Sequence, residues 1–221
     1  MTWDEYAKAW SALHGGFDPA QASPVVRGWV RLAYRGGSLL GRLRVGPTAV
    51  TCAGLVLCLA VPFAARPGPV GLIFAAVLVL LAAFADGLDG AVAVVSGRVS
   101  RMGFVYDSMA DRLGEVAWLA AFWVAGARGW LVVAGGATSW LHEYLRARAT
   151  AGGMTEIGAV TVGERPTRVS VAISGLLIGG VAGLVHNGWA ATVVTIAAAA
   201  WLALSLIGFG QLITTVRRAL R

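Results

Sequence analysis

Long apolar runs fill most of the sequence from residue 47 onward, and they constrain the fold more than any other feature. A helix of roughly 20 apolar residues is long enough to cross a bilayer. Six such runs lie at 47–65, 69–95, 104–127, 130–150, 167–185 and 189–212. Only 13% of the 221 residues are charged, whereas soluble domains carry about 25%. The sequence therefore predicts an all-α membrane bundle of six transmembrane helices and excludes a water-soluble enzyme domain.

Residues 1–46 precede the first apolar run and show a different pattern. Apolar side chains recur at helical spacing from Trp3 to Leu13 and again from Val26 to Ala33, where arginines lie between them. Early charged residues argue against a signal peptide. The pattern predicts one or two amphipathic helices on the membrane surface, with a disordered tail as the alternative. We expect a juxtamembrane segment over 1–46 and a membrane domain over 47–221.

The basic residues are unevenly divided between the two ends of the predicted spans. Of the 18 basic residues, 17 are arginine and 16 lie on the side that holds both termini, against Arg66 and Arg128 on the other side. Because basic loops stay in the cytoplasm, we expect both termini there. The Arg-rich, Lys-poor composition favours a bacterial inner membrane. Topology accounts for the net charge of +7, so we expect no nucleic-acid partner.

Small residues form a stripe on the fifth apolar run. Gly175, Gly179 and Gly183 are four residues apart, and such spacing lets two helices approach closely. The stripe predicts either packing within the bundle or a dimer face.

Four aspartates mark the stretch with the most chemical information. Asp86 and Asp89 are three residues apart near the end of the second run, and Asp107 and Asp111 are four apart at the start of the third. On helices these spacings put each pair on one face. A short connection returns the chain antiparallel, so the four carboxylates can meet.

Four carboxylates in a membrane bundle need compensation. One charged side chain at the centre of a membrane helix costs roughly 2.5–3.5 kcal/mol. Divalent cations neutralise carboxylates and keep positions open for substrate phosphates. One alternative is a structural network with Arg98, Arg101 and Arg112. Another is an ion or proton pathway in a transporter, although the two matching halves typical of many transporters are not evident.

The same stretch resembles the signature of the CDP-alcohol phosphatidyltransferase family, which is D-x-x-D-G-x-x-A-R, eight residues, then G-x-x-x-D-x-x-x-D. The matching positions are Asp86, Asp89, Gly90, Ala93, Gly103, Asp107 and Asp111. Val94 stands where the pattern has arginine, and Arg98 would lie one turn further if the helix continues. The resemblance covers about residues 25–212 and implies six spans with a cytoplasmic site.

The resemblance also implies roles for individual residues. Asp86, Asp89, Asp107 and Asp111 would hold two Mg²⁺ or Mn²⁺ ions, and Asp111 would also be the general base. The residues expected to contact the donor are Gly90, Ser100, Pro47, Thr48, Thr51 and Arg98.

Two further segments, 144–148 (YLRAR) and 164–168 (ERPTR), are rich in arginine. They resemble segments of actinobacterial phosphatidylinositol phosphate synthases. Arg146, Arg165 and Arg168 would bind a phosphate on the acceptor, since arginine grips phosphate with a planar fork. The alternative is that they anchor the cytoplasmic side. His142, Glu143 and Glu115 are expected to be polar residues of the bundle.

The resemblance implies a metal-dependent enzyme that transfers a phosphatidyl group from CDP-diacylglycerol to an alcohol hydroxyl and releases CMP. The acceptor would be polar and phosphate-bearing, such as inositol phosphate or glycerol phosphate. Membrane lipid and a second copy in a homodimer are the other expected partners. Two alternatives stay open, namely a non-catalytic paralogue and an ion-coupled membrane transporter.

Overall fold

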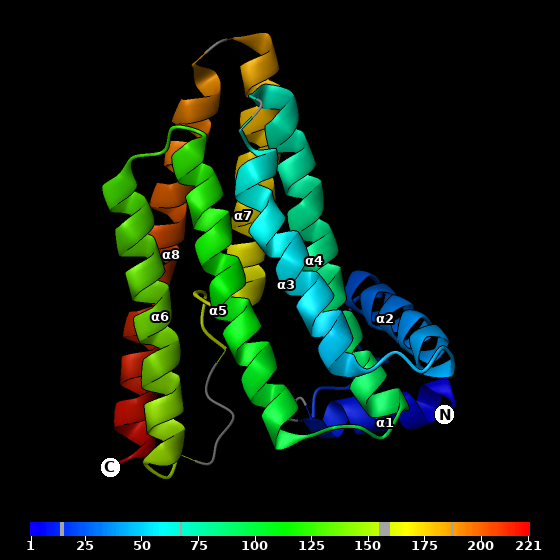
Figure 1. Ribbon diagram of the computed structural model, residues 1–221. Coiled ribbons are helices and arrows are strands. Elements are labelled where there is room, and N and C mark those ends of the chain that lie inside the picture. The colour runs from blue at the N-terminus through cyan, green and yellow to red at the C-terminus, as the bar shows by residue number, and fades with distance from the viewer. Residues whose placement is uncertain (14–15, 67, 155–159, 187) are drawn as a thin grey trace. The chain divides into compact units, whose positions relative to one another are not determined.

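The computed structural model describes residues 1–13, 16–66, 68–154, 160–186 and 188–221. Pro67, residues 155–159 and Asn187, which lie between the predicted apolar runs, are outside the described residues. Within these ranges the chain forms eight α-helices and no β-strand (Figure 1). The helices are α1 (Trp3–Leu13), α2 (Pro24–Arg42), α3 (Pro47–Ala64), α4 (Pro69–Val95), α5 (Arg101–Val124), α6 (Gly129–Ala151), α7 (Arg165–Val185) and α8 (Trp189–Ala219).

The all-α prediction is confirmed, and each of the six apolar runs forms one helix, from α3 to α8. The largest difference is at the end of α8, which reaches Ala219 instead of residue 212. Four helices, α3, α4, α7 and α8, are long and apolar enough to cross a membrane. Helices α5 and α6 carry Asp, Glu, Arg and His along part of their length, which lowers their hydropathy. The helices therefore support a membrane-embedded protein.

The chain forms two compact units. Unit 1 comprises Met1–Val56 and Leu81–Asp111, and unit 2 comprises Leu57–Leu80 and Arg112–Arg221. Unit 1 therefore joins the N-terminal helices α1 and α2 to part of the predicted membrane domain.

The core of unit 1 holds α1 and α2 against the end of α4. Tyr6 of α1, which is 1% exposed, packs with Val30 and Ala33 of α2 and with Ala91 and Val94 of α4. These apolar contacts explain why a short helix with charged residues on its other face is ordered on this unit.

Backbones also approach closely in unit 1. A Cβ at Gly37 of α2 would lie 3.0 Å from the carbonyl carbon of Ala91, so a larger side chain there would push α2 away from α4. The Tyr34 hydroxyl donates a hydrogen bond of 2.7 Å to the Met1 carbonyl oxygen and fixes the start of the chain.

In unit 2 the glycine stripe of α7 packs within the chain. A Cβ at Gly175 would lie 2.5 Å from Cβ of Ala197 on α8, and one at Gly183 would lie 2.8 Å from the ring of Pro69. Of the two interpretations of this stripe, the structure supports close packing within the bundle.

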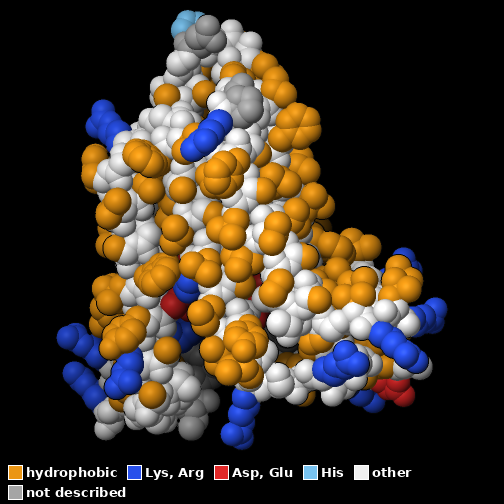
Figure 2. Space-filling view, viewed as in Figure 1, with side chains coloured by type: hydrophobic (Ala, Val, Ile, Leu, Met, Phe, Trp, Pro, Cys, Tyr) orange, Lys and Arg blue, Asp and Glu red, His pale blue; other side chains and the backbone are white. Residues whose placement is uncertain are grey.

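Many large apolar side chains are exposed on the helices. Figure 2 shows hydrophobic side chains over most of the visible surface. Strongly exposed examples are Val56, Phe63, Phe74, Trp123, Trp130 and Val133. Because soluble monomers rarely expose apolar patches of this extent, these side chains fit a lipid environment.

The docking of α1 can be tested at Val94. An arginine there would bury a charge in the apolar cluster around Tyr6, at a cost of several kcal/mol, and α1 should detach. Lys8, the one lysine of the sequence, lies on α1, so endoproteinase Lys-C cuts the full chain at one site. We expect Val94→Arg and Tyr6→Ala to be cut about tenfold faster than the parent, measured by intact mass spectrometry.

The matched control is Val25→Ala, at an exposed position of α2. It should be cut at the parent rate. Equal rates in all four proteins would contradict the docking of α1 on α4.

Candidate functional site

Three carboxylates converge in unit 1. Asp86 of α4 and Asp107 and Asp111 of α5 each place a carboxylate oxygen within 4.8 Å of the others, and all three side chains are half-buried. Helix α4 ends at Val95 and α5 begins at Arg101, so the chain turns back within residues 96–100. This short turn brings together aspartates that belong to two different helices.

Asp89, the fourth aspartate of the motif, is held beside this group by α3. It is 6% exposed and accepts a hydrogen bond of 2.5 Å from the Thr51 hydroxyl. Thr51 Oγ1 also lies 3.2 Å from the carbonyl oxygen of Pro47, the first residue of α3. Thr51 therefore links the start of α3 to the acidic part of α4.

Three of the four carboxylates line a pocket of about 260 Å³. Asp86, Asp89 and Asp107 form its acidic part. Gly90 also lines the pocket, and nothing lies within 4 Å of the place a Cβ would take there. The remaining wall is formed by side chains of α1 and α2, among them Tyr6, and by Gly87, Ala91 and Val94 of α4. Burial raises the pKa of Tyr6 to about 12, so this phenol stays neutral near pH 7 and is no candidate base.

The donor atoms fit a divalent cation. Carboxylate oxygens are the ligands that Mg²⁺ and Mn²⁺ favour. The three that meet here come from rigid helices and lie close enough together to bind one ion in common. Asp89 lines the same pocket as Asp86 and Asp107.

The other expected donor contacts lie in different places. Of the described residues that line the pocket, Gly90 is the only one in the expected donor set. The Ser100 hydroxyl accepts a hydrogen bond of 3.0 Å from the Gly103 amide in the first turn of α5, and Thr48 is exposed in the first turn of α3. Each residue therefore lies at the start of a helix, and this place accounts for its conformation.

Arg98 lies beyond the end of α4. The helix stops at Val95, and Gly97 has a φ of 65°, in the left-handed region. The additional helical turn that would bring Arg98 next to Val94 therefore does not form. Val94 itself is buried in the apolar cluster of Tyr6.

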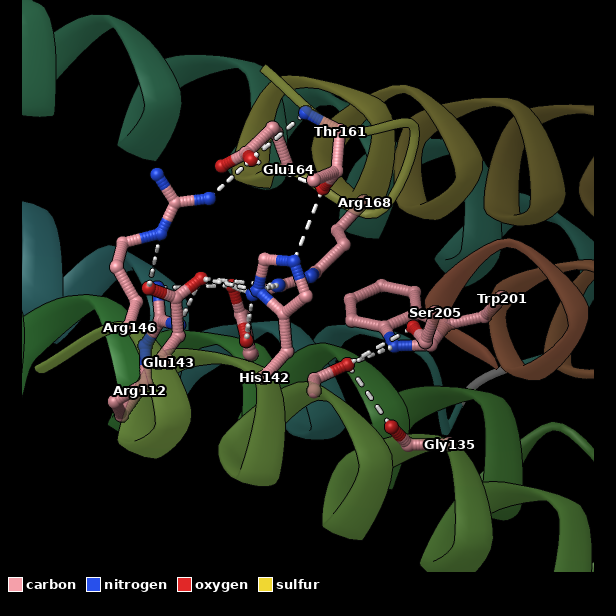
Figure 3. Close-up of polar contacts among 12 residues, drawn as sticks. Arg112, Gly135, His142, Glu143, Arg146, Thr161, Glu164, Arg168, Trp201 and Ser205 are labelled. Atoms are coloured by element: carbon pink, nitrogen blue, oxygen red, sulfur yellow. Dashed lines mark hydrogen bonds and ion pairs between the residues drawn. The ribbon is translucent and has the colours of Figure 1, made fainter. Parts of the chain in front are cut away.

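A second polar cluster surrounds Arg168 in unit 2 (Figure 3). Arg168 lies in the first turn of α7 and is 2% exposed. Its Nη1 donates to both carboxylate oxygens of Glu115, at 2.9 and 3.1 Å, and its Nη2 donates to Glu143 at 3.0 Å. Glu115 is only 1% exposed, so this is a buried ion pair.

The other two expected acceptor residues are also engaged. Arg146 forms an ion pair with Glu164, which also accepts hydrogen bonds from the Thr161 amide and hydroxyl at 3.1 and 3.0 Å. Arg165 lies over the Trp118 ring, 5.8 Å from its centroid. The sequence pattern indicated the arginines but not these partners, which lie up to 53 residues away.

Residues 44–213 match the family model for CDP-alcohol phosphatidyltransferases, which is most of the chain. This protein belongs to the CDP-alcohol phosphatidyltransferase family. The resemblance seen in the aspartate motif is therefore confirmed.

Two curated relatives of this phosphatidyltransferase share a substantial part of its sequence. The archaetidylinositol phosphate synthase of Aeropyrum pernix is 32% identical over 148 residues, which are 66% of this chain and 74% of the relative. The phosphatidylinositol phosphate synthase of Mycolicibacterium smegmatis is 39% identical over 145 residues, which are 60% of this chain and 63% of the relative.

Solved structures share the fold of this phosphatidyltransferase. The phosphatidylinositol phosphate synthase of Mycobacterium tuberculosis in complex with manganese and citrate is 25% identical with a TM-score of 0.68, over 84% of this chain and 88% of that chain. The same enzyme with CDP-DAG bound is 22% identical with a TM-score of 0.66, over 84% and 94%.

Replacing Asp107 by asparagine should weaken Mn²⁺ binding to this phosphatidyltransferase. The change removes one carboxylate of the converging three, so we expect affinity to fall by about tenfold or more. The measurement is titration of the Mn²⁺ electron paramagnetic resonance signal on purified protein in detergent. Asp4→Asn removes the same charge at an exposed position of α1 and should bind as the parent does. Parent-like affinity in Asp107→Asn would refute a metal centre here.

Replacing Arg168 by methionine should destabilise unit 2. Glu115 would stay buried with only the Arg112 contact at 3.2 Å, and removing one partner of a buried ion pair costs about 3–5 kcal/mol. We expect the thermal midpoint to fall by about 10 °C in a fluorescence melt.

Lysine should not rescue position 168, because an ammonium lacks the planar fork that reaches two carboxylates. Adding Glu115→Gln to Arg168→Met should restore part of the loss. Arg148→Met, at an exposed position of α6, is the control. A midpoint of Arg168→Met equal to that of the control would contradict a stabilising ion pair.

Proposed function

We propose that this phosphatidyltransferase makes a phosphoinositide-type phospholipid. It would transfer the phosphatidyl group of CDP-diacylglycerol to a hydroxyl of inositol phosphate and release CMP. The observation that carries the proposal is the convergence of Asp86, Asp107 and Asp111 beside a pocket that also contains Asp89. The names of the two curated relatives support inositol phosphate as the acceptor.

We propose that the six helices from α3 to α8 cross a bacterial inner membrane. Helices α5 and α6 have 24 and 23 residues, and roughly 20 are enough to span a bilayer. Both termini would be cytoplasmic, since the basic residues gather on their side. Helices α1 and α2 would lie at the inner surface, where α2 presents a series of arginines to anionic lipid.

Two Mg²⁺ or Mn²⁺ ions would be held by Asp86, Asp89, Asp107 and Asp111. The manganese complex of the Mycobacterium tuberculosis enzyme supports this use of divalent metal. When bound, such ions neutralise phosphate charge and orient the two reacting partners. Thr51 would keep the Asp89 carboxylate in one orientation through its 2.5 Å hydrogen bond.

Asp111 is the residue to which we assign the proton transfer. Its carboxylate would accept the hydroxyl proton of the acceptor as that oxygen bonds to the phosphorus attached to diacylglycerol. The bond from this phosphorus to the oxygen of CMP breaks, and CMP leaves with the electron pair. Gly90, which has no side chain, lets the donor approach the backbone of α4.

The acceptor phosphate would be bound by the arginine cluster of unit 2. Arginine suits phosphate because its planar fork donates two parallel hydrogen bonds. The candidates are Arg146, Arg165 and Arg168. Glutamate carboxylates form ion pairs with Arg146 and Arg168, and these pairs would hold the two side chains in a fixed orientation.

The catalytic proposal predicts CMP release that depends on both metal and Asp111. Purified protein with CDP-diacylglycerol and inositol phosphate should release CMP with Mg²⁺ or Mn²⁺ and should stop when EDTA is added. Asp111→Asn should lower kcat by roughly 10²–10⁴-fold, measured by chromatography of CMP. The exposed Asp4→Asn variant should keep the parent rate.

An acceptor comparison tests the substrate assignment. With labelled CDP-diacylglycerol, inositol phosphate should give a labelled phospholipid product, and unphosphorylated inositol should give little. A product from inositol alone would overturn the phosphate-bearing acceptor. Metal-independent CMP release, or none with any acceptor tested, would overturn the proposed function.

A further inference from the structure

Helix α1 contributes side chains to the pocket that contains the carboxylates. Tyr6, Trp10 and Leu13 line this pocket together with Asp86 and Asp107. They are spaced four and three residues apart, which puts them on one face of the helix. The family match begins at residue 44, so this face belongs to a part of the chain that the shared pattern does not describe.

Several contacts hold α1 in this position. Tyr6 is buried against Val94 and Ala91 of α4, and Arg31 of α2 stacks over the Trp3 ring at 5.0 Å from its centroid. An apolar residue at position 94 is what lets Tyr6 pack there, because a charged side chain would have to be buried in the same cluster.

The pocket therefore joins two kinds of chemistry. One part carries the carboxylates and suits a metal-bound phosphate. The other part carries aromatic rings from α1 and α2, including Trp10 and Trp29. A nucleotide has the matching composition, since it carries phosphate at one end and a flat base at the other.

Trp10 and Trp29 are the two tryptophan rings of the pocket, and neither is fully buried. Tyr6 is 1% exposed and belongs to the apolar cluster. Trp29 is 37% exposed. It contacts Phe84 edge-on at 5.5 Å, and its Nε1 lies 3.4 Å from the place a Cβ of Gly87 would take, so part of its ring packs against α4. Trp10 is half-buried and packs against the apolar cluster of Tyr6. Phe17 contacts its ring in a T-shaped arrangement at 6.0 Å.

We propose that α1 is part of the donor site and that Trp10 stacks on the cytosine base of the CDP donor. The assignment rests on the proposed function, because it takes the carboxylates as the phosphate end of the same site. A base stacked on an aromatic side chain contributes about 1–3 kcal/mol in alanine-substitution measurements. Trp10 then determines specificity for the nucleotide and takes no part in proton transfer.

The test compares two ligands that differ only in the base. CMP and ribose 5-phosphate are titrated calorimetrically into the full-length protein in detergent with Mn²⁺. Trp10→Ala should weaken CMP binding roughly 5- to 150-fold and leave ribose 5-phosphate binding unchanged. Trp10→Phe, which keeps an aromatic face, should bind CMP within a few-fold of the parent.

Trp130→Ala is the matched control, since Trp130 is an exposed tryptophan of α6 that does not line the pocket. It should bind CMP as the parent does. Lys-C cleavage after Lys8 reports whether α1 stays docked in each variant, and Trp10→Ala should be cut at the parent rate.

Three results would overturn the assignment to Trp10. These are parent-like CMP binding in Trp10→Ala, an equal loss in Trp130→Ala, and an equal loss of ribose 5-phosphate binding. In each case the parent still binds CMP and still turns over CDP-diacylglycerol, so the proposed function survives. A parent protein that neither binds CMP nor releases it would refute the proposed function and this assignment together.

Discussion

The close approach of carboxylates in unit 1 is the constraint on which the site depends. Asp86, Asp107 and Asp111 bring oxygens within 4.8 Å of one another, and like charges at such separations repel strongly where water is scarce. A divalent cation bound by the three groups would offset this repulsion. The rest of unit 1 supports that geometry. A short turn at residues 96–100 reverses the chain, Thr51 anchors Asp89, and Gly37 lets α2 lie against α4.

Much of this could be predicted from the sequence, because the information is local. Hydropathy located α3 to α8, and the spacing of the aspartates on two consecutive helices predicted that their carboxylates could meet. The end of α4 was harder to predict. A helix that continued to Arg98 would need a helical φ at Gly97, but Gly97 has a φ of 65°, in the left-handed region. Pairings between distant residues leave no periodic signal. Nothing in the pattern around Tyr6 indicates that it packs on Val94, or that Glu115 meets Arg168.

A usable signal did exist for the ion pair of unit 2. Glu115 follows Asp111 by one helical turn and enters the apolar part of α5, and a carboxylate in such a position requires a cationic partner. One partner, Arg112, lies three residues earlier on the same helix, and its Nη2 is 3.2 Å from Glu115. Only the structure identifies the second partner, Arg168, which is 53 residues away. The same limit applies to α1. Its amphipathic pattern predicted a helix with one apolar face. The pattern does not show whether lipid or protein covers that face.

The most direct measurement of the central claim is anomalous diffraction from crystals of the protein soaked in Mn²⁺, recorded at the manganese absorption edge. The account predicts anomalous peaks bonded to carboxylate oxygens of Asp86, Asp107 and Asp111, and no peak at these positions in crystals of an Asp86→Asn, Asp107→Asn double variant. Crystals of catalytically active protein whose manganese peaks lie elsewhere, or that show none, would contradict it.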